Sequence, residues 1–367
     1  MAERRSRAED RESPTATPDF PAVARAHLDA MSNEIGVWQH AIGSAPNPAF
    51  GFCTDDIARA LVVDVLHARE LGWAAVARSA DRSVRFLEDA FVPESGRLRN
   101  FRAAAGNWLD SGGSEDSHAR AMAGLAMVVA EVGDPDLVER AARLFARSLP
   151  AARSLTALRP VAAAILACEA ALEGGIEGGI DGETEAVHRN LVGRLKAAFD
   201  DVASAPDWPW PEPVLTYENA ILPHALLAAG KRMEDDRLVD VGCGVLDWLI
   251  EEQTSNDGAF SPIGNGWWPR SGARSRFDQQ PIEATTTLLA AEAALAATGD
   301  ERYRGAARMA YQWFLGNNLV GVRLADPSSG GCCDGLTPRG VNPNQGAEST
   351  LMWLTALEHM RHLSSRS

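Results

Sequence analysis

The chain has 367 residues, of which 46% are hydrophobic, and a formal net charge of −15. This excess of acidic side chains disfavours nucleic acids and anionic membrane surfaces as partners. No run of about 18 apolar residues occurs, so we expect no membrane-spanning helix.

The N-terminus and the cysteines indicate the compartment. Residues 1–19 are charged and rich in Ser, Thr and Pro, without the apolar stretch of a signal peptide, so we predict a disordered tail there. The five cysteines are odd in number and two are adjacent, which does not suit a disulfide framework and fits a reducing compartment. We therefore predict a cytoplasmic protein.

Residues 20–367 alternate between two kinds of predicted helix, and we expect them to form a single domain. One kind is amphipathic, with apolar residues at i, i+3, i+4 and i+7: roughly Ala22–Met31, then Ala74–Phe91, Pro135–Leu149, Glu183–Val202, Asp236–Gln253 and Glu301–Leu315. The other kind is Ala-rich and apolar on nearly all sides, as expected of buried helices: Ile57–Leu71, Ala119–Val132, Val161–Leu172, Ala220–Ala229, Ala284–Ala297 and Thr350–Met360.

Six inner and six outer helices in alternation predict an all-α (α/α)6 toroid. The segments that enter the inner helices are long and carry unusual residues, whereas those that leave them are short, which suits a closed ring with one functional face. A linear helical solenoid is the competing architecture. Strand signals are sparse, and short segments such as Val320–Leu324 are the only candidates for pairing. The Gly-rich segment Gly174–Gly182 is predicted to be a flexible loop on the opposite face.

Two loops combine Trp, Asp, Glu, Gln, Asn and Arg. They are Phe260–Glu283, which contains the sequence Gly266-Trp267-Trp268-Pro269-Arg270, and Gly330–Glu348, which contains Cys332-Cys333-Asp334. Aromatic faces stack on sugar C–H groups, and planar polar side chains bind adjacent hydroxyls. This composition predicts a site for a polyhydroxylated ligand.

Carboxylates recur where inner helices begin. They are Asp55, Asp56, Glu115, Asp116, Glu218, Asp278, Glu283 and Glu348. Each taken alone is explained by helix capping and by the helix dipole. In a toroid, however, these helix ends converge on one cavity, where neighbouring carboxylates perturb each other's pKa and can divide into an acid and a base. Glycoside cleavage uses such a pair.

For the other candidate site residues, a role in ligand binding competes with a purely structural role. Trp38, Trp267 and Trp268 lie in loops and either stack on sugar or pack the loops. His40 and His118 fall on the predicted functional face, and Arg270 either binds an anionic ligand or is solvated. Cys332 and Cys333 could bind zinc with a histidine, but without CxxC spacing small buried thiols are favoured, and we predict neither a metal nor a cofactor.

Seven segments resemble a known group of bacterial proteins: CTDD (Cys53–Asp56), GSEDSH (Gly113–His118), TYEN (Thr216–Asn219), SPIGNGWWPR (Ser261–Arg270), FDQQPIEA (Phe277–Ala284), GGCCDGL (Gly330–Leu336) and NQGAEST (Asn344–Thr350). That group occurs alone or fused behind glycosyltransferase domains and is similar to six-hairpin glycosidase-like proteins. The resemblance covers about Glu34 to Met360. It implies an (α/α)6 fold and suggests a separate glycosyltransferase as a partner, but it implies no particular reaction, because such toroids include hydrolases, phosphorylases, epimerases and lyases.

The leading hypothesis is an enzyme that cleaves or transfers a glycosidic bond, with a small molecule or oligosaccharide as substrate. The candidate catalytic residues are Asp56, Glu115, Asp116, Asp278 and Glu348, with Asp278 favoured as base or nucleophile. The candidate substrate-binding residues are Trp38, His40, Asp55, His118, Tyr217, Glu218, Asn219, Trp267, Trp268, Arg270, Gln279, Gln280, Glu283, Asp334 and Asn344. The alternatives are a sugar or cyclic-metabolite isomerase or lyase that uses His40 or His118, and a glycan-binding module that serves a glycosyltransferase.

Overall fold

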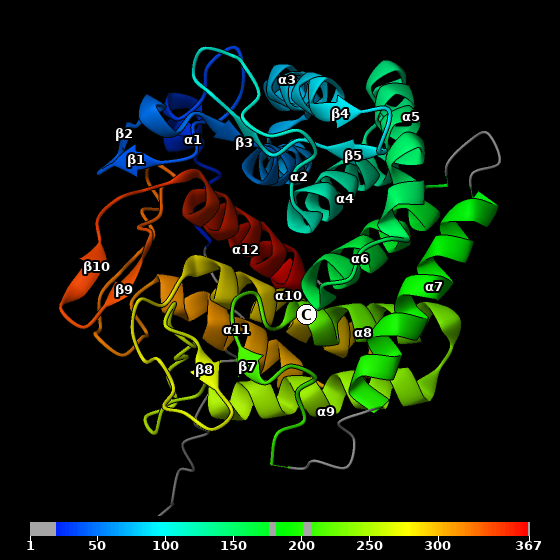
Figure 1. Cartoon of the computed structure of the whole chain (residues 1–367). Coiled ribbons are helices and arrows are strands. Elements are labelled where there is room, and N and C mark those ends of the chain that lie inside the picture. The colour runs from blue at the N-terminus through cyan, green and yellow to red at the C-terminus, as the bar shows by residue number, and fades with distance from the viewer. Residues whose placement is uncertain (1–19, 176–180, 201–206, 366–367) are drawn as a thin grey trace, which may run out of the picture.

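The computed structural model describes residues 20–175, 181–200 and 207–365. The predicted tail 1–19 lies outside these ranges, as does most of the predicted Gly174–Gly182 loop. Within them the chain forms twelve α-helices joined by loops that carry short strands (Figure 1). Among these helices, none combines the length and the apolar character that crossing a membrane requires.

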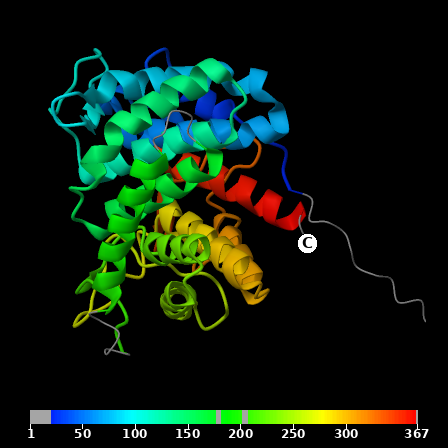
Figure 2. The ribbon, with the colours of Figure 1, turned by 90° about the vertical axis from the view of Figure 1, so that its right-hand side faces the viewer.

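Six helices form an inner ring. They are α2 (Thr54–Leu71), α4 (Glu115–Glu131), α6 (Leu158–Gly174), α8 (Ile221–Met233), α10 (Pro281–Thr298) and α12 (Ala347–Ser365). Each packs against the next in this order, and α12 packs against α2, which closes the ring. In Figure 2, α12 lies between α2 and α10. A linear solenoid would leave the first and last inner helices apart, so the predicted (α/α)6 toroid is confirmed.

The other six helices lie outside the ring. They are α1 (Ala26–Ala30), α3 (Trp73–Ala90), α5 (Pro135–Ala152), α7 (Asp181–Asp200), α9 (Asp236–Glu252) and α11 (Arg302–Phe314). Each packs on an inner helix, as α3 does on α2 and α5 on α4. Their sequences are amphipathic because only one face is covered: in α5, Leu137, Leu144 and Phe145 are buried against the ring.

Small residues allow the inner helices to approach each other closely. In α4, a methyl group added at Gly124 would lie 2.9 Å from the Ala58 carbonyl oxygen of α2. In α6, one added at Gly174 would lie 2.6 Å from the Ala130 Cα. The Ala-rich composition that identifies these helices in the sequence therefore has a packing reason.

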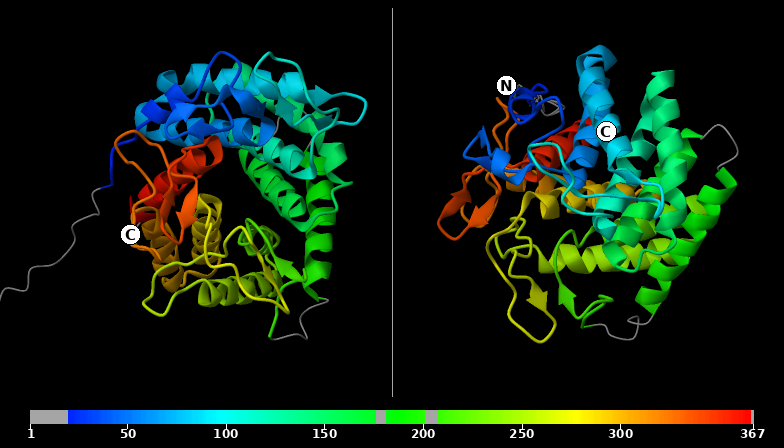
Figure 3. Two further views of the ribbon diagram at one scale, coloured as in Figure 1. Left: turned by 60° about the vertical axis from the view of Figure 1, so that its left-hand side comes forward. Right: turned by 45° about the horizontal axis from the view of Figure 1, so that its top comes forward.

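Among the described residues, ten short strands pair in five antiparallel ladders, all in the loops that lead into inner helices. They are β1 (Ala41–Ile42) with β2 (Ala45–Pro46), β3 (Phe52–Cys53) with β6 (Phe101–Arg102), β4 (Phe91–Val92) with β5 (Arg97–Leu98), β7 (Val214–Leu215) with β8 (Trp268–Pro269), and β9 (Gly335–Thr337) with β10 (Gly340–Asn342). The orange hairpin of Figure 3 is one of these ladders. A 3₁₀ turn, Pro48–Phe50, precedes β3. Val320–Leu324, named as a candidate for pairing, belongs to none of these ladders, although the Leu324 carbonyl accepts from the Cys333 amide at 3.0 Å. Its turn is closed instead by Asn318, which donates to the Val322 carbonyl at 2.7 Å.

Candidate functional site

A polar cavity of about 310 Å³ opens where the first turns of α2 and α12 meet the neighbouring loops. Polar and ionisable side chains dominate its wall. The lining residues are Gln39, His40, Cys53, Asp55, Asp56, Arg59, Gln280, Asp334, Asn342, Gly346, Glu348 and Ser349. Of the predicted site residues, the cavity thus brings together His40, Asp55, Asp56, Gln280, Asp334 and Glu348.

Backbone and side-chain contacts fix the two helix starts that supply this wall. The Thr54 hydroxyl at the start of α2 donates to the Arg99 carbonyl at 2.6 Å. At the start of α12, Asp334 accepts from the Gly346 amide at 2.8 Å. Side chains of a helix lean toward its N-terminus, so residues in these first turns point to the cavity.

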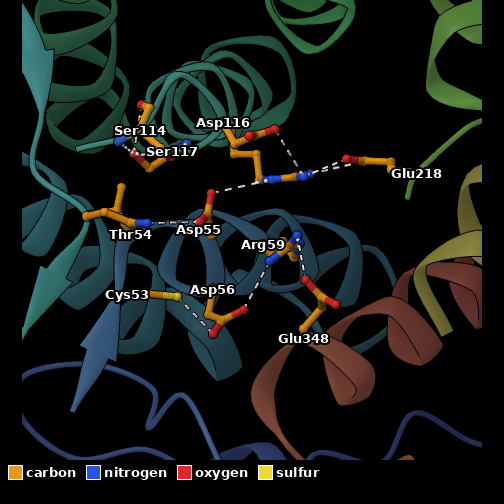
Figure 4. A network of polar contacts seen from close by, with 12 residues as sticks. Cys53, Thr54, Asp55, Asp56, Arg59, Ser114, Asp116, Ser117, Glu218 and Glu348 are labelled. Carbon is orange, nitrogen blue, oxygen red and sulfur yellow. Dashed lines mark hydrogen bonds and ion pairs between the residues drawn. The ribbon is translucent and has the colours of Figure 1, made fainter. Parts of the chain in front are cut away.

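Arg59 binds two carboxylates of this wall (Figure 4). Its Nη1 lies 3.1 Å from Asp56 Oδ1, and its Nη2 lies 2.9 Å from Glu348 Oε2. The second oxygen of Asp56 accepts from the Cys53 thiol at 3.0 Å. The side chain of Asp56 is buried, whereas that of Glu348 is 40% exposed. One guanidinium therefore holds a buried and a solvent-reachable carboxylate side by side.

The pKa of Asp56 is raised to about 7. Burial is the main cause, and the negative charge of Glu348 adds to it, while Arg59 acts in the opposite direction. A carboxyl group with this pKa exists in both protonation states near neutral pH. It can therefore donate or accept a proton there.

A second arginine, Arg120 of α4, holds the carboxylates on the other side of the ring. Its Nη1 donates to Glu218 Oε1 at 2.9 Å, and its Nε lies 3.4 Å from Asp55 Oδ1. Burial opposes ionisation of Glu218, but Arg120 together with the charges of Arg59 and Arg159 outweighs it, so the pKa of Glu218 is lowered. Asp116 accepts from the Tyr217 hydroxyl at 3.0 Å. Asp116, Tyr217 and Glu218 are not among the residues that line the polar cavity.

Two predicted carboxylates cap helices. Glu115 accepts from the Thr156 and Ala157 amides, at 2.8 and 2.9 Å, directly before α6. Glu283 accepts from the Glu218 amide and, at 3.3 Å, from Asn219 Nδ2, before α8. Burial raises the pKa of Glu283 to about 7. These contacts match the capping interpretation, with the difference that each carboxylate caps a neighbouring helix instead of its own.

Asp278, the favoured base in the sequence analysis, is exposed and does not line the cavity. Its backbone is left-handed, with φ 57°, and its carbonyl accepts from the Asn265 amide at 3.0 Å. The unusual composition of this loop, which drew attention to Asp278, is explained by a tight loop conformation.

The loop tryptophans lie outside the cavity wall. Trp38 stacks on Phe52 with ring centroids 4.3 Å apart. Trp268 packs edge-on against Trp208 at 5.2 Å in a cluster of aromatic rings. Trp267 is 45% exposed at a left-handed position. Trp38 and Trp268 thus have the contacts of loop packing, and Trp267 remains free at the surface.

Several predicted polar residues hold the loops together. Gln279 is buried and accepts from the Trp313 indole at 2.9 Å, and Asn344 accepts from the Gly43 amide at 3.0 Å. Asn219 accepts from Arg159 at 2.9 Å. Arg270 is exposed and is not part of the cavity wall.

The two histidine candidates differ in position. His40 lines the cavity beside Asp334, whose pKa it lowers in opposition to the dominant effect of burial. The ring of His40 meets Phe50 edge-on at 4.7 Å. His118 is fully buried and lies outside the cavity wall, and burial lowers its pKa to about 4.

The two cysteines considered as zinc ligands are Cys332 and Cys333, and the structure shows how Cys332 is packed. Cys332 is fully buried, which raises the pKa of its thiol. Within the described ranges, no three His, Cys, Asp or Glu side chains are grouped so that they could hold a metal ion.

Sequence reasoning missed the two arginines that organise the site, Arg59 and Arg120. A signal was present, because each lies between two alanines in a predicted inner helix. Arginine is rarely buried unless it is paired, so each indicates a buried carboxylate partner. Only the arrangement of the helices in the ring shows that Arg59 and Arg120 each lie at the centre of an ion-pair cluster.

A search of protein-family profiles and of characterised sequences finds no match to the chain. Solved structures do match. Cellobiose 2-epimerase from Spirochaeta thermophila aligns with a TM-score of 0.71 over 95% of both chains, at 13% identity. D-mannose isomerase aligns with a TM-score of 0.68 over 91% of this chain and 93% of that chain, at 11% identity.

The GH76 α-mannanase from Bacteroides thetaiotaomicron aligns with a TM-score of 0.59, over 93% of this chain and 94% of that chain, at 8% identity. At such identities the likeness establishes the fold alone. The chain has the (α/α)6 toroid fold of six-hairpin glycosidase-like enzymes that act on sugars.

Proposed function

We propose that the protein is an enzyme that uses paired carboxylates for acid–base chemistry on a small saccharide, and that its reaction is the cleavage or transfer of a glycosidic bond. The observation that carries this proposal is the arrangement of Asp56 and Glu348 on one guanidinium at the wall of a polar cavity. The sugar-processing neighbours of the same fold support the substrate class.

The two carboxylates suit different roles. Asp56 is buried with a pKa of about 7, so it can be protonated at neutral pH and give its proton to the leaving-group oxygen. Glu348 is half exposed and held by Arg59, so its carboxyl group can reach a substrate to activate water or attack the anomeric carbon. Arg59 fixes both side chains in place.

The remaining wall can hold sugar hydroxyls. Gln39, Gln280 and Asn342 offer both donors and acceptors, and Asp334 offers an acceptor on the same surface. The cavity volume of about 310 Å³ suits a small saccharide better than a long polysaccharide segment.

A second candidate function is the isomerisation or epimerisation of a sugar. His40 favours it, because an imidazole on the cavity wall next to Asp334 can carry a proton to and from a carbon next to a carbonyl group. A cellobiose 2-epimerase and a D-mannose isomerase among the structural neighbours also support this candidate. In that reaction Asp56 or Glu348 would act on the hydroxyl protons.

Product analysis separates these functions. The purified protein is incubated with a panel of monosaccharides and disaccharides in deuterated water, and the products are followed by NMR. Glycosidic cleavage predicts new reducing ends, and the anomer formed first distinguishes inversion from retention. Isomerisation predicts a new sugar with deuterium on carbon and no new reducing ends.

A glycan-binding module that serves a separate glycosyltransferase gives a third pattern. It predicts saturable sugar binding without any product. It also predicts that the amide variants Asp56→Asn and Glu348→Gln bind and function normally. Turnover that disappears in both variants would contradict that pattern and support the enzyme.

A further inference from the structure

A second cavity lies on the axis of the toroid, beyond the layer formed by Arg59, Arg120 and Glu218. Its volume is about 160 Å³, and its wall is almost entirely apolar. Each inner helix contributes one or more side chains, among them Ala58, Ala123, Ala163, Ile221, Leu289 and Met352 from α2, α4, α6, α8, α10 and α12 in turn. Arg59 is the residue that this wall shares with the polar cavity.

Small residues leave this space open. Three of the six helices present an alanine at this level of the ring, Ala58, Ala123 and Ala163, where larger side chains would meet on the axis. Protein interiors are normally packed with few voids larger than a water molecule. An apolar pocket of this size between six helices can therefore take a small ligand.

The cavity is reachable from the face opposite the polar site. Val62, Leu166 and Leu289 lie in the middle of inner helices, point to the axis, and are nevertheless only half-buried. One turn further along, on the same stripes, Met127 and Ala170 are also half-buried. Because Arg59 and Arg120 with their carboxylates close the other end, the opening lies toward the C-terminal ends of the inner helices.

Apart from Arg59 and Arg120 at one end, the wall offers a ligand few hydrogen-bonding partners. The Thr286 hydroxyl donates to the Ile282 carbonyl at 2.9 Å, and the Thr355 hydroxyl donates to the Leu351 carbonyl at 2.8 Å. Glu218 is bound by Arg120. A sugar would lose its hydrogen bonds to water there without replacing them, so polar ligands are disfavoured.

We propose that this axial cavity is a binding site for a small, neutral, apolar molecule, separate from the saccharide site. An apolar cavity of about 150 Å³ is large enough to take benzene and stays dry when empty. The occupant would touch Arg59, the residue that positions Asp56 and Glu348 on the other side of the layer. His359 of α12 and Glu292 of α10 form an ion pair at 2.6 Å. They lie one turn beyond Thr355 and Leu289, toward the end at which the cavity opens.

Binding is tested on the full chain with indole and benzene as probes, by ligand-dependent shifts of Tm and by saturation-transfer NMR. Ala123→Leu fills the cavity and should weaken binding roughly tenfold or more. The matched control is Ala296→Leu on α10, which makes the same change at an exposed position and should bind as the native chain does. No binding to the native chain, or equal binding by Ala123→Leu, would overturn the proposal.

Two further measurements keep the test decisive if Ala123→Leu does not fold. Leu289→Ala enlarges the cavity and should admit naphthalene, which the native chain should exclude. Xenon applied to crystals should give an anomalous peak on the axis between Ala123 and Leu289. Exclusion of naphthalene by Leu289→Ala, or xenon bound only elsewhere, would count against the site. None of these measurements depends on catalysis, so their outcome is independent of whether the proposed function is correct.

Discussion

Two clusters in the ring each consist of one arginine and its carboxylate partners, but the pKa of the main carboxyl group shifts in opposite directions in the two clusters. On the α2–α12 side, Arg59 binds Asp56 and Glu348, and the pKa of Asp56 is raised to about 7. On the α4–α8 side, Arg120 binds Glu218 through both Nη atoms, and the pKa of Glu218 is lowered. The types of residue do not explain the difference.

The positive charges and guanidinium hydrogen bonds around each carboxylate explain it. Burial opposes ionisation of Glu218, but the charge and hydrogen bonds of Arg120, with the charges of Arg59 and Arg159, together outweigh it. Asp56 receives one guanidinium hydrogen bond, shares that guanidinium with the charge of Glu348, and has only a thiol on its second oxygen. Asp56 can therefore exchange a proton near neutral pH, whereas Glu218 stays ionised in its pair with Arg120. The predictions that follow test this contrast.

The largest effect is expected from amide substitutions in the Arg59 cluster. Asp56→Asn and Glu348→Gln should each lower kcat by roughly a thousandfold or more, because each removes a group that moves a proton or charge in the reaction. Asp278→Asn is the matched control, an exposed carboxylate outside the cavity, and should change kcat less than threefold by comparison. Steady-state kinetics on the substrate found by NMR, with circular dichroism to verify folding, decides the point. An inactive Asp278→Asn would restore that residue as the catalytic base.

Breaking the Arg120 cluster should affect stability more than chemistry. Arg120→Met leaves the buried Glu218 carboxylate without its partner, which should cost about 3–5 kcal/mol of unfolding free energy. Urea unfolding followed by fluorescence measures this loss. Arg78→Ala removes an exposed arginine that pairs with Glu34 at 2.9 Å, and should cost less than about 1 kcal/mol. Similar losses in both variants would contradict the distinction.

The raised pKa of Asp56 predicts how stability depends on pH. Protonated Asp56 is favoured in the folded state, so its stabilising contribution is complete below pH 4 and is lost as the pH rises through about 7. The native chain should therefore lose stability relative to Asp56→Asn between pH 4 and 8. About 1.4 kcal/mol per pKa unit sets a ceiling of about 4 kcal/mol. Parallel stability curves for the two proteins would show that Asp56 titrates normally. Under the proposed function, kcat/KM should also fall above about pH 7.

The smallest effect is expected at a capping carboxylate. Glu115→Gln weakens the hydrogen bonds to the Thr156 and Ala157 amides, and should cost about 1 kcal/mol of stability with little change in kcat. Thermal unfolding and the same kinetic assay measure both quantities. A large loss of activity with unchanged stability would indicate instead that Glu115 takes part in the reaction.

Much of the fold was predictable from local patterns. The all-round apolar and amphipathic helices appear close to their predicted bounds, as with Asp236–Gln253 against α9 at Asp236–Glu252. Periodicity is a local property, and Asp134-Pro135 starts α5 where capping rules place it. The paired strands were not predictable, and the candidate Val320–Leu324 lies outside the ladders, because pairing in these loops depends on distant partners, as when Phe52 pairs with Arg102.

The site was predictable only in part. Of the carboxylates predicted at inner-helix starts, Asp55, Asp56 and Glu348 line one cavity, whereas Glu115, Asp278 and Glu283 do not. Composition could not separate them from Glu115 and Glu283, which have the same residue type and the same helix position but cap neighbouring helices. Asp278 was chosen from loop composition, and it lies at a left-handed position outside the cavity wall; unusual backbone geometry and chemistry draw on the same residue types.

The sequence by itself determined the helices, their inner and outer places, and the face on which polar residues gather, because these follow from periodicity and capping along the chain. Only the tertiary structure decided which carboxylates share a guanidinium and which cap a helix. The closing contact of α12 with α2 brings Glu348 to Arg59 across nearly the whole chain. The pKa of Asp56 is set by that burial and that neighbour, and no local pattern encodes either.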